Sequence, residues 1–207
     1  MRMVLMDIIL KDITKSYDGQ MVLKNFNWTI EENKFNFIMG ESGIGKTTLI
    51  NILMGIVKPD SGEIYGIEGK KLSIVFQENR LLEDFDPVTN LKLVADKDTR
   101  DEEIKTLLRE LGLEDSLKKK VSQLSGGMKR RLAIGRALIA RADIVIMDEP
   151  FKELDKDLYL KTIQLVKEKL KGKTVIIVTH SEEECEIFGG RKIIWKDIQE
   201  RIYKKEL

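Results

Sequence analysis

The pattern of apolar and polar positions divides the chain into a strand-rich start, a helical middle and an alternating end. At the start, two strand-like runs at residues 8–17 and 22–30 flank Asp18-Gly19, a pair that is typical of tight hairpin turns. A short apolar run at 35–39 predicts a buried strand. We therefore expect an antiparallel hairpin that is followed by a core strand.

Helical periodicity begins after two further strand-like runs, at 63–65 and 72–76. Pro87 suits the first turn of a helix. The amphipathic run 101–111 has acids in its first turn and a glycine after its end, as helices commonly do. Another helix is expected at 129–139. The middle of the chain is therefore expected to be mainly helical.

Two fully apolar runs near the end, 144–147 and 174–178, have the composition of strands in a parallel sheet that is covered on both faces. The amphipathic run 156–171 predicts a helix between them, and residues 192–195 predict a last strand. The pattern therefore indicates a parallel sheet with flanking helices.

The stretch from Gly40 to Thr48 fits G-x-x-x-x-G-K-[ST], the phosphate-binding loop, and it precedes a helix-like run at 49–54. Glycines let the main chain wrap round phosphate oxygens, and the N–H groups at a helix start attract an anion. Lys46 adds a charge for the β- and γ-phosphates, and Thr47 offers a hydroxyl to Mg²⁺. A chance match in an ordinary turn is the alternative, which the strand–loop–helix context disfavours. The residues expected to bind the nucleotide are Gly40, Glu41, Ser42, Gly43, Ile44, Gly45, Lys46, Thr47 and Thr48.

Two carboxylates, Asp148 and Glu149, directly follow the apolar run 144–147. Ligands bind at the carboxyl ends of strands in open α/β sheets, so one acid there can hold Mg²⁺ and the other can polarise an attacking water. The alternative is a pair of loop carboxylates that lysines neutralise. His180, the only histidine, follows the run 174–178 and is a candidate contact for a γ-phosphate, although a lone histidine is usually a structural or surface residue.

Three weaker candidates need further support. Tyr17 stands near the end of a strand, where its ring could stack on a base, but a half-buried structural tyrosine is more common. Gln77 follows a strand-like run and by itself indicates only a solvated loop. Ser125 and two glycines open a helix, either as a second anion site or as a capped helix start. The basic run 129–131 that follows fits a solvated face.

The balance of charges limits the classes of partner. The chain has 36 basic and 35 acidic residues, a net charge of +1, which gives no general reason to expect nucleic acid or an anionic membrane as partner. Its single cysteine, Cys185, excludes an internal disulfide and is expected to be a packing residue. Residues 1–10 show no cleavage-site pattern, and no apolar run approaches the ~18 residues that a membrane helix needs. We therefore expect a cytosolic chain.

These motifs together resemble the ATP-binding cassette (ABC) ATPase family over almost the whole chain. The resemblance rests on six elements in order: the phosphate loop, Gln77, Leu124-Ser-Gly-Gly-Met128, Ile144-Val-Ile-Met-Asp-Glu149, Leu154-Asp155 and His180. The Leu-Ser-Gly-Gly element is nearly diagnostic at its spacing before the apolar-Asp-Glu strand. Met128 departs from the family's more common glutamine, and we expect little effect. A softer resemblance, through the residues after Gly127 and through Asp-Glu-Pro-Phe151, is to the nitrate, sulfonate and taurine importer group.

The resemblance implies a role for each candidate residue. Tyr17 would stack on adenine, and Asp155 would communicate with the opposite subunit. The implied catalytic residues are Glu149 as general base, His180 as γ-phosphate contact and Gln77 as sensor of the transporter. The implied Mg²⁺ ligands are Thr47, Gln77 and Asp148. The residues implied to bind the ATP of a partner subunit are Ser125, Gly126 and Gly127.

The implied fold is α/β: a RecA-like P-loop NTPase core with an N-terminal antiparallel β subdomain and a helical insert. Residues 1–207 would form a single ABC ATPase domain with the helical subdomain at about 80–131. A homodimer or a paired cassette would enclose ATP and Mg²⁺, and hydrolysis would open it. Expected partners are separate transmembrane permease subunits and an extracytoplasmic substrate-binding protein, with the chain peripheral on the inner, cytoplasmic face of the cell membrane.

Several functions remain compatible with the motifs. The first is the ATPase subunit of an importer, and the second is the cassette of an exporter or of a lipid- or lipoprotein-releasing system. A non-transport factor that acts on nucleic acid or ribosomes is disfavoured by the single cassette and the near-zero net charge. A catalytically dead binding module is disfavoured by Lys46, Asp148, Glu149 and His180. We expect an importer ATPase whose solute is selected by other subunits.

Overall fold

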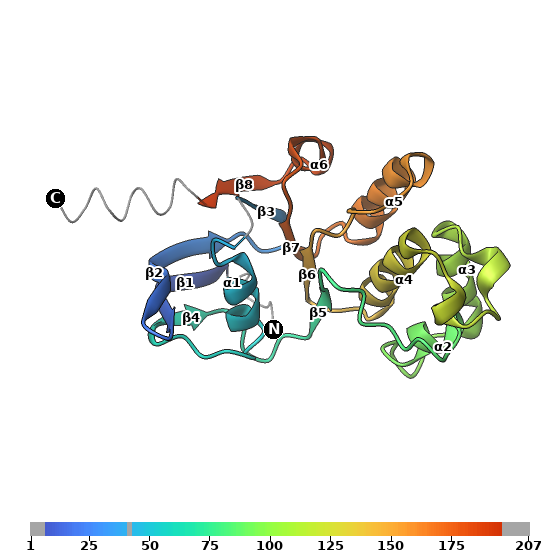
Figure 1. Cartoon of the computed structure of the whole chain (residues 1–207), viewed down its shortest axis with the longest axis horizontal. Helices are drawn as coiled ribbons and strands as arrows, with labels where there is room; N and C mark the ends of the chain where they lie inside the picture. The colour runs from blue at the N-terminus through green and yellow to red at the C-terminus, as the bar shows by residue number, and fades with distance from the viewer. Residues whose placement is uncertain (1–6, 41–42, 196–207) are drawn as a thin grey trace, which may run out of the picture. The chain divides into compact units, whose positions relative to one another are not determined.

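The computed structural model describes residues 7–40 and 43–195. Its contacts group the chain into two compact units, which we name unit 1 (residues 1–72 and 172–207) and unit 2 (residues 73–171). Unit 2 contains the helices drawn from green to orange (Figure 1). Each unit buries its own set of apolar side chains.

The antiparallel sheet of unit 1 has the strand order β2-β1-β4, with β1 (Ile8–Tyr17), β2 (Gln20–Ile30) and β4 (Ser61–Tyr65). β1 and β2 are joined by Asp18 and Gly19, which both have a positive φ (48° and 80°), as in the tight turns that match hairpin twist. Ile8 pairs with Ile30, and Tyr17 pairs with Gln20. The predicted hairpin is therefore confirmed.

Unit 1 also contains three parallel strands in the order β7-β3-β8, with β3 (Phe35–Met39), β7 (Thr174–Val178) and β8 (Arg191–Ile194). In the middle strand β3, Phe37 pairs with Ile177 on one side and with Lys192 on the other. β7 is buried along its length and β3 is buried after its first residue, which explains their continuous apolar sequences. The last strand begins one residue earlier than predicted.

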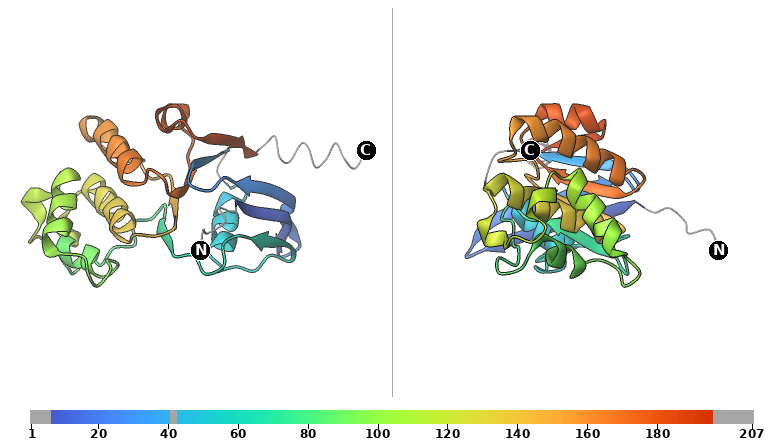
Figure 2. Two further views of the ribbon diagram at one scale, coloured as in Figure 1. Left: turned by 180° about the vertical axis from the view of Figure 1, so that it is seen from behind. Right: turned by 90° about the vertical axis from the view of Figure 1, so that its right-hand side faces the viewer.

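Two helices complete unit 1, namely α1 (Lys46–Leu53) after β3 and α6 (Glu182–Phe188) between β7 and β8. α1 buries Leu49 and Leu53 and lies next to the antiparallel sheet (Figures 1 and 2). Ser181 caps α6 by accepting a hydrogen bond from the Glu184 amide at 3.2 Å. Cys185 on α6 is buried beside Met39, and burial raises the pKa of its thiol to about 11. The thiol is therefore a neutral packing group.

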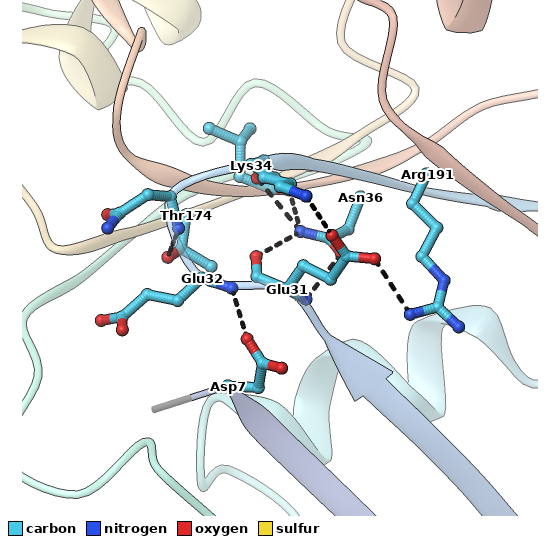
Figure 3. Close-up of polar contacts among 9 residues, drawn as sticks. Asp7, Glu31, Glu32, Lys34, Asn36, Thr174 and Arg191 are labelled. Carbon is cyan, nitrogen blue, oxygen red and sulfur yellow. Dashed lines mark hydrogen bonds and ion pairs between the residues drawn. The ribbon is translucent and has the colours of Figure 1, made fainter. Parts of the chain in front are cut away.

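The turn before β3 is fixed by the buried side chain of Asn36 (Figure 3). The Asn36 amide donates to the carbonyls of Glu31 and Lys34, each at 3.0 Å, and its oxygen accepts from the Glu31 amide at 2.9 Å. The Glu31 carboxylate also pairs with Arg191 at 3.1 Å, and this pairing lowers the pKa of Glu31 further after the larger effect of Lys34. These contacts fix the amino end of β3, at the opposite end of the strand from the phosphate loop.

Unit 2 contains two strands, β5 (Leu72–Val75, beginning at the unit boundary) and β6 (Ile144–Asp148). Its four α-helices are α2 (Pro87–Lys92), α3 (Asp101–Glu110), α4 (Gly126–Ile139) and α5 (Lys156–Lys169), and two short 3-10 helices lie at Glu114–Ser116 and Val121–Gln123. β5 and β6 are neighbours in one sheet, and α2, α3 and α4 pack together (Figure 1). Gly135 makes the close packing possible, since a Cβ there would lie 2.7 Å from Leu111 Cδ1. Pro87 is the first residue of α2, and Gly112, with φ of 65°, follows the end of α3, so both predictions are confirmed.

The structure changes the prediction for the helix after Leu124. α4 begins at Gly126 rather than at residue 129, because Ser125 is already its N-cap and accepts a hydrogen bond from the Met128 amide at 3.3 Å. The solvated-face interpretation of the basic run is wrong for Arg130 and Arg131, which are each 3% exposed. Within residues 7–40 and 43–195, none of the helices has the length and apolar character that crossing a membrane demands.

Candidate functional site

The phosphate loop joins β3 to α1 in unit 1. Gly45 is the N-cap of α1 and has a φ of 109°, which side-chain-bearing residues rarely adopt. A Cβ on Gly40 would lie 2.8 Å from Cβ of Trp195, and one on Gly45 would lie 3.2 Å from Cζ2 of the same tryptophan. The loop therefore packs on Trp195, which is 1% exposed. Of the predicted loop residues, Glu41 and Ser42 lie outside the described residues.

The side chains at the start of α1 differ in how far they are buried. Lys46 is 7% exposed, and its ammonium donates to the carbonyl of Gly40, so it folds back over the loop. Thr47 is exposed and Thr48 is half-buried. A lysine and the N–H groups of a helix start are thus gathered round one turn of main chain, which makes an electropositive cradle for an anion.

His180 lies at the same edge of the parallel strands as the phosphate loop. Ile38 on β3 pairs with Val178 on β7, and the Thr179 amide donates to the Ile38 carbonyl at 3.2 Å. The exposed His180 follows directly, two residues after Val178, just as Gly40 comes two residues after Ile38. The structure therefore brings these two sequence candidates together.

Tyr17 is held at the end of β1 by its neighbours. Its ring is 43% exposed, and the Lys15 ammonium lies 5.4 Å from the ring centroid. Lys15 and the Ser16 amide both bind the Asp60 carboxylate, at 2.6 and 2.7 Å, and the Lys15 hydrogen bond is the main reason why the pKa of Asp60 is lowered. An exposed ring on a fixed strand end is compatible with stacking on a base.

Unit 2 carries the two carboxylates and the glutamine. Asp148 is the last residue of β6 and is 9% exposed, and Glu149 follows it half-buried. Glu149 has a φ of 48°, a left-handed conformation that is uncommon for a residue with a side chain. Gln77 is exposed, two residues after the end of β5, the neighbouring strand.

Arg130 connects these two strand ends, and sequence reasoning missed it. Its guanidinium donates to the carbonyls of Asp148 and Glu149 at 2.6 Å each and to the carbonyl of Gln77 at 3.2 Å. It also donates to main-chain carbonyls of Phe76 and Pro150. Burial lowers the pKa of Arg130, and the nearby carboxylates of Asp148, Glu153 and Glu149 act in the opposite direction.

The start of α4 lies against the loop that contains Asp155. A Cβ on Gly127 would lie 3.2 Å from the Glu153 carbonyl and 3.5 Å from Oδ2 of Asp155. Ser125 and Gly126 are exposed, and Gly127 is buried. Asp155 precedes α5, and its carboxylate lies 3.7 Å from Nη1 of Arg131. Ser125, Gly126 and Asp155 therefore belong to one exposed region of unit 2, which borders the buried Gly127.

A model of the ABC transporter family matches residues 23–152, which is more than half of the chain. The chain belongs to the ABC transporter family. Its resemblance to ABC ATPases, stated from the motifs, is confirmed.

Relatives of this ABC chain include two import ATP-binding proteins. The spermidine/putrescine import ATP-binding protein PotA of Fusobacterium nucleatum is 38% identical over 197 residues, which cover 86% of this chain and 52% of PotA. The taurine import ATP-binding protein TauB of Roseobacter denitrificans is 34% identical, with 91% of this chain and 75% of TauB covered. The chain thus spans about half the length of the PotA relatives that it matches.

The ABC fold is also shown by solved structures. A dimeric structure of the ATP-binding cassette MJ0796 in a post-hydrolysis state, bound to ADP and Pi, has a TM-score of 0.80 and 33% identity, and covers 90% of this chain and 93% of its own. The predicted α/β P-loop fold with an N-terminal antiparallel sheet is therefore confirmed. In this ABC cassette the residues that the motifs missed are Arg130 and Trp195, whose partners are distant in sequence.

Proposed function

We propose that this chain is the ATP-binding and ATP-hydrolysing subunit of an ABC importer. The observation that carries the proposal is the electropositive cradle of unit 1, in which Lys46 folds over the glycine loop at the start of α1. A helix start with a nearby lysine suits the phosphates of a nucleotide. The similarity to two proteins that are named as import ATP-binding proteins supports the importer class. Their named solutes differ, so the proposal stops at import.

The residues of unit 1 would bind and orient ATP. The amides after Gly45 and the Lys46 ammonium would bind the phosphates, and the Tyr17 ring would stack on adenine. His180 would contact the γ-phosphate from the end of β7. The buried packing of the loop on Trp195 would hold these groups in place before the nucleotide arrives.

Glu149 would act as the general base. Its carboxylate would take a proton from water as the water oxygen attacks the γ-phosphorus and the bond to the β-phosphate oxygen breaks, giving ADP and phosphate. Gln77 would orient the water. The left-handed main chain at Glu149 would set the direction of the carboxylate.

The donors proposed for Mg²⁺ are chemically suited to it. Thr47, Gln77 and Asp148 all offer oxygen atoms, which Mg²⁺ prefers, and Asp148 is buried with its carbonyl bound by Arg130. No group of three or more His, Cys, Asp or Glu side chains that could hold a metal occurs in the part of the chain that the structure describes, so phosphate oxygens would complete the shell. When bound, Mg²⁺ would neutralise charge on the β- and γ-phosphates.

The assembly proposed for this chain is a dimer of cassettes, either identical or paired. Ser125, Gly126 and Gly127 would bind ATP that the partner subunit holds, and Asp155 beside them would communicate between subunits. The dimeric cassette structures support this arrangement. Separate permease subunits and an extracytoplasmic substrate-binding protein would complete the transporter, with this chain on the inner face of the membrane. The division into one cassette with a helical subdomain at 80–131 stays a prediction.

The test is phosphate release from Mg·ATP by the full chain and by Glu149→Gln. The substitution should lower turnover by roughly 10²- to 10⁴-fold and leave ATP affinity unchanged, because it removes the base and keeps the side-chain volume. Glu168→Gln on the exposed side of α5 is the matched control and should hydrolyse ATP like the wild type. Near-normal hydrolysis by Glu149→Gln would remove Glu149 from the role.

A further inference from the structure

Arg130 is a buried cation that donates hydrogen bonds to main-chain carbonyls and to one side-chain amide oxygen. It is the fifth residue of α4 and is 3% exposed. Nε donates to Pro150 at 2.9 Å, and Nη2 donates to Asp148 and Glu149 at 2.6 Å. Nη1 donates to Phe76 at 2.5 Å, to Gln77 at 3.2 Å and to Oδ1 of Asn79 at 3.4 Å. All five N–H groups of the guanidinium can therefore be satisfied here.

Only arginine has the geometry for this arrangement. Its planar fork presents five donors in fixed directions, whereas a lysine ammonium presents three donors at one point. Burying a charge is costly, and carbonyl dipoles on several sides offset that cost. Arg136, six residues further along the same helix, donates to the carbonyl of Arg80 at 2.9 Å. Arg130 and Arg136 thus differ in how many main-chain carbonyls they bind.

The carbonyls that Arg130 binds belong to two strand ends. One stretch follows β5 and contains Gln77, and the other follows β6 and contains Glu149. Glu149 has a left-handed conformation, which persists only where surrounding contacts over-determine it. The bonds to the carbonyls of Asp148 and Glu149 fix the peptide planes on both sides of the Glu149 α-carbon. The Glu149 carbonyl also accepts from the Lys152 amide at 3.2 Å.

We propose that Arg130 is a positioning residue that joins helix α4 to Glu149 and Gln77, so that a movement of α4 changes the direction of the Glu149 carboxylate. α4 begins at Ser125, in the exposed region that contains Asp155. Binding at that exposed region that moves α4 would therefore change the position of the general base, Glu149, through the side chain of Arg130 within unit 2. The inference rests on the proposed role of Glu149 as general base.

A purely structural role for Arg130 makes a different prediction. In that case its substitution lowers the melting temperature and the fraction of folded protein, and the folded molecules keep their normal turnover. A positioning role lowers the turnover of folded molecules. ATP affinity should stay within about threefold of the wild type, because the proposed ATP-binding cradle is formed by residues of unit 1, whereas Arg130 belongs to unit 2.

The experiment compares Arg130→Lys and Arg130→Gln with the wild type, and Arg136→Lys serves as the matched control. We expect both Arg130 variants to lose roughly 10- to 100-fold in kcat with little change in KM, since a misplaced base is costly even when binding is intact. Arg136→Lys should retain its activity. Normal kcat in a folded Arg130→Lys protein would overturn the proposal.

A double-mutant cycle separates action through Glu149 from a general effect. In a Glu149→Gln background, Arg130→Lys should have little further effect on the residual turnover, because the group it positions is already lost. Fully additive losses would show that Arg130 acts independently of Glu149 and would overturn the proposal.

Hydrogen exchange tests the same contact without ATP. Amides in peptides that cover 77–80 and 149–152 should exchange faster in Arg130→Lys than in Arg136→Lys, and the Lys152 amide is the most direct reporter. Unchanged exchange there would overturn the proposal even if activity falls. A wild-type chain without ATPase activity would instead count against the proposed function, and the exchange result would still decide whether Arg130 holds the two segments.

Discussion

The two strand ends that carry the candidate residues are built in different ways. After β3 the chain turns through glycines, with a φ of 109° at Gly45 and no room for a side chain at Gly40 beside Trp195. After β6 the chain turns through Glu149, which has a side chain and a φ of 48°, and Arg130 binds the carbonyls on both sides. The turn after β3 depends on glycines, which have no side chain. The turn after β6 depends on the guanidinium of Arg130, which lies on α4.

Because the two turns are built differently, different kinds of substitution should disrupt them. The β3 turn should be damaged by one added methyl group, because its space is already filled by Trp195 and Val22. The β6 turn should tolerate small changes near it and be damaged by the loss of one distant side chain. Substitutions of opposite kinds, additions in unit 1 and removals in unit 2, therefore probe the comparison.

The largest effects are expected from two substitutions, one of which tests ATP binding in unit 1 and the other the exposed region of unit 2. Lys46→Ala should weaken ATP binding by about 10- to 100-fold, because a charge-assisted contact with phosphate is lost. Ser125→Arg should leave ATP binding by the monomer almost intact, and it should lower turnover by roughly two orders of magnitude if Ser125 serves the ATP of a partner. Calorimetry and phosphate release measure the two quantities.

Mixing these two proteins sharpens that test. A mixed dimer of Lys46→Ala and Ser125→Arg has one pair of intact halves and one pair of broken halves, so part of the activity should return. A Ser125→Arg monomer that already fails to bind ATP would rule out the role in trans. Mixed dimers that form without recovering activity would show that both sites must be intact or that no site is shared.

An effect on ATP binding of similar size to that of Lys46→Ala is expected within the phosphate loop. Gly45→Ala should weaken ATP binding by about 10- to 100-fold, because the new Cβ would lie 2.9 Å from Val22 and the φ of 109° strains it. Gly43→Ala is the matched control: its φ is 82°, but no atom lies within 4 Å of the new Cβ, so it should cost less than about tenfold. Titration with a fluorescent ATP analogue measures both affinities. Equal losses would mean that main-chain strain and not packing on Val22 and Trp195 sets the effect.

The smallest effect is expected for the ion pair that joins Asp155 to Arg131, the neighbour of Arg130. Arg131 is paired with Asp155 at 3.7 Å, but the Asp155 side chain is 73% exposed and solvent screens the interaction. Asp155→Asn should therefore change the free energy of unfolding by less than about 1 kcal/mol, measured by urea denaturation. A loss of several kcal/mol would show that this exposed pair holds the start of α5 as firmly as Arg130 holds β6.

Most of the fold and the local motifs were predictable because their signals lie in short stretches of sequence. The Asp18-Gly19 hairpin, the buried runs of β3, β6 and β7 and the glycine loop each fix their own conformation. The basic residues after Met128 looked like a solvated face, since nothing local shows which face of α4 is buried.

The contacts that hold the candidate residues were not predictable, because they join positions that lie far apart in the sequence. Arg130 binds carbonyls 18 and 54 residues away, and main-chain carbonyls have no sequence signature. Trp195 reaches under Gly40 only because β8 pairs with β3. The position of His180 at the same strand edge as the loop was anticipated, because parallel strands place their carboxyl ends together.

The position of the two tryptophans makes them an intrinsic fluorescence probe of unit 1. Trp28 and Trp195 are the only tryptophans, both are buried in unit 1, and Trp195 stacks on Phe26 with ring centroids 5.0 Å apart. Most helical residues, those of α2 to α5, belong instead to unit 2. Intrinsic fluorescence therefore follows the melting of unit 1, whereas the helical circular dichroism signal mainly follows unit 2. Coincidence of the two melting curves would show that the units unfold as one cooperative block.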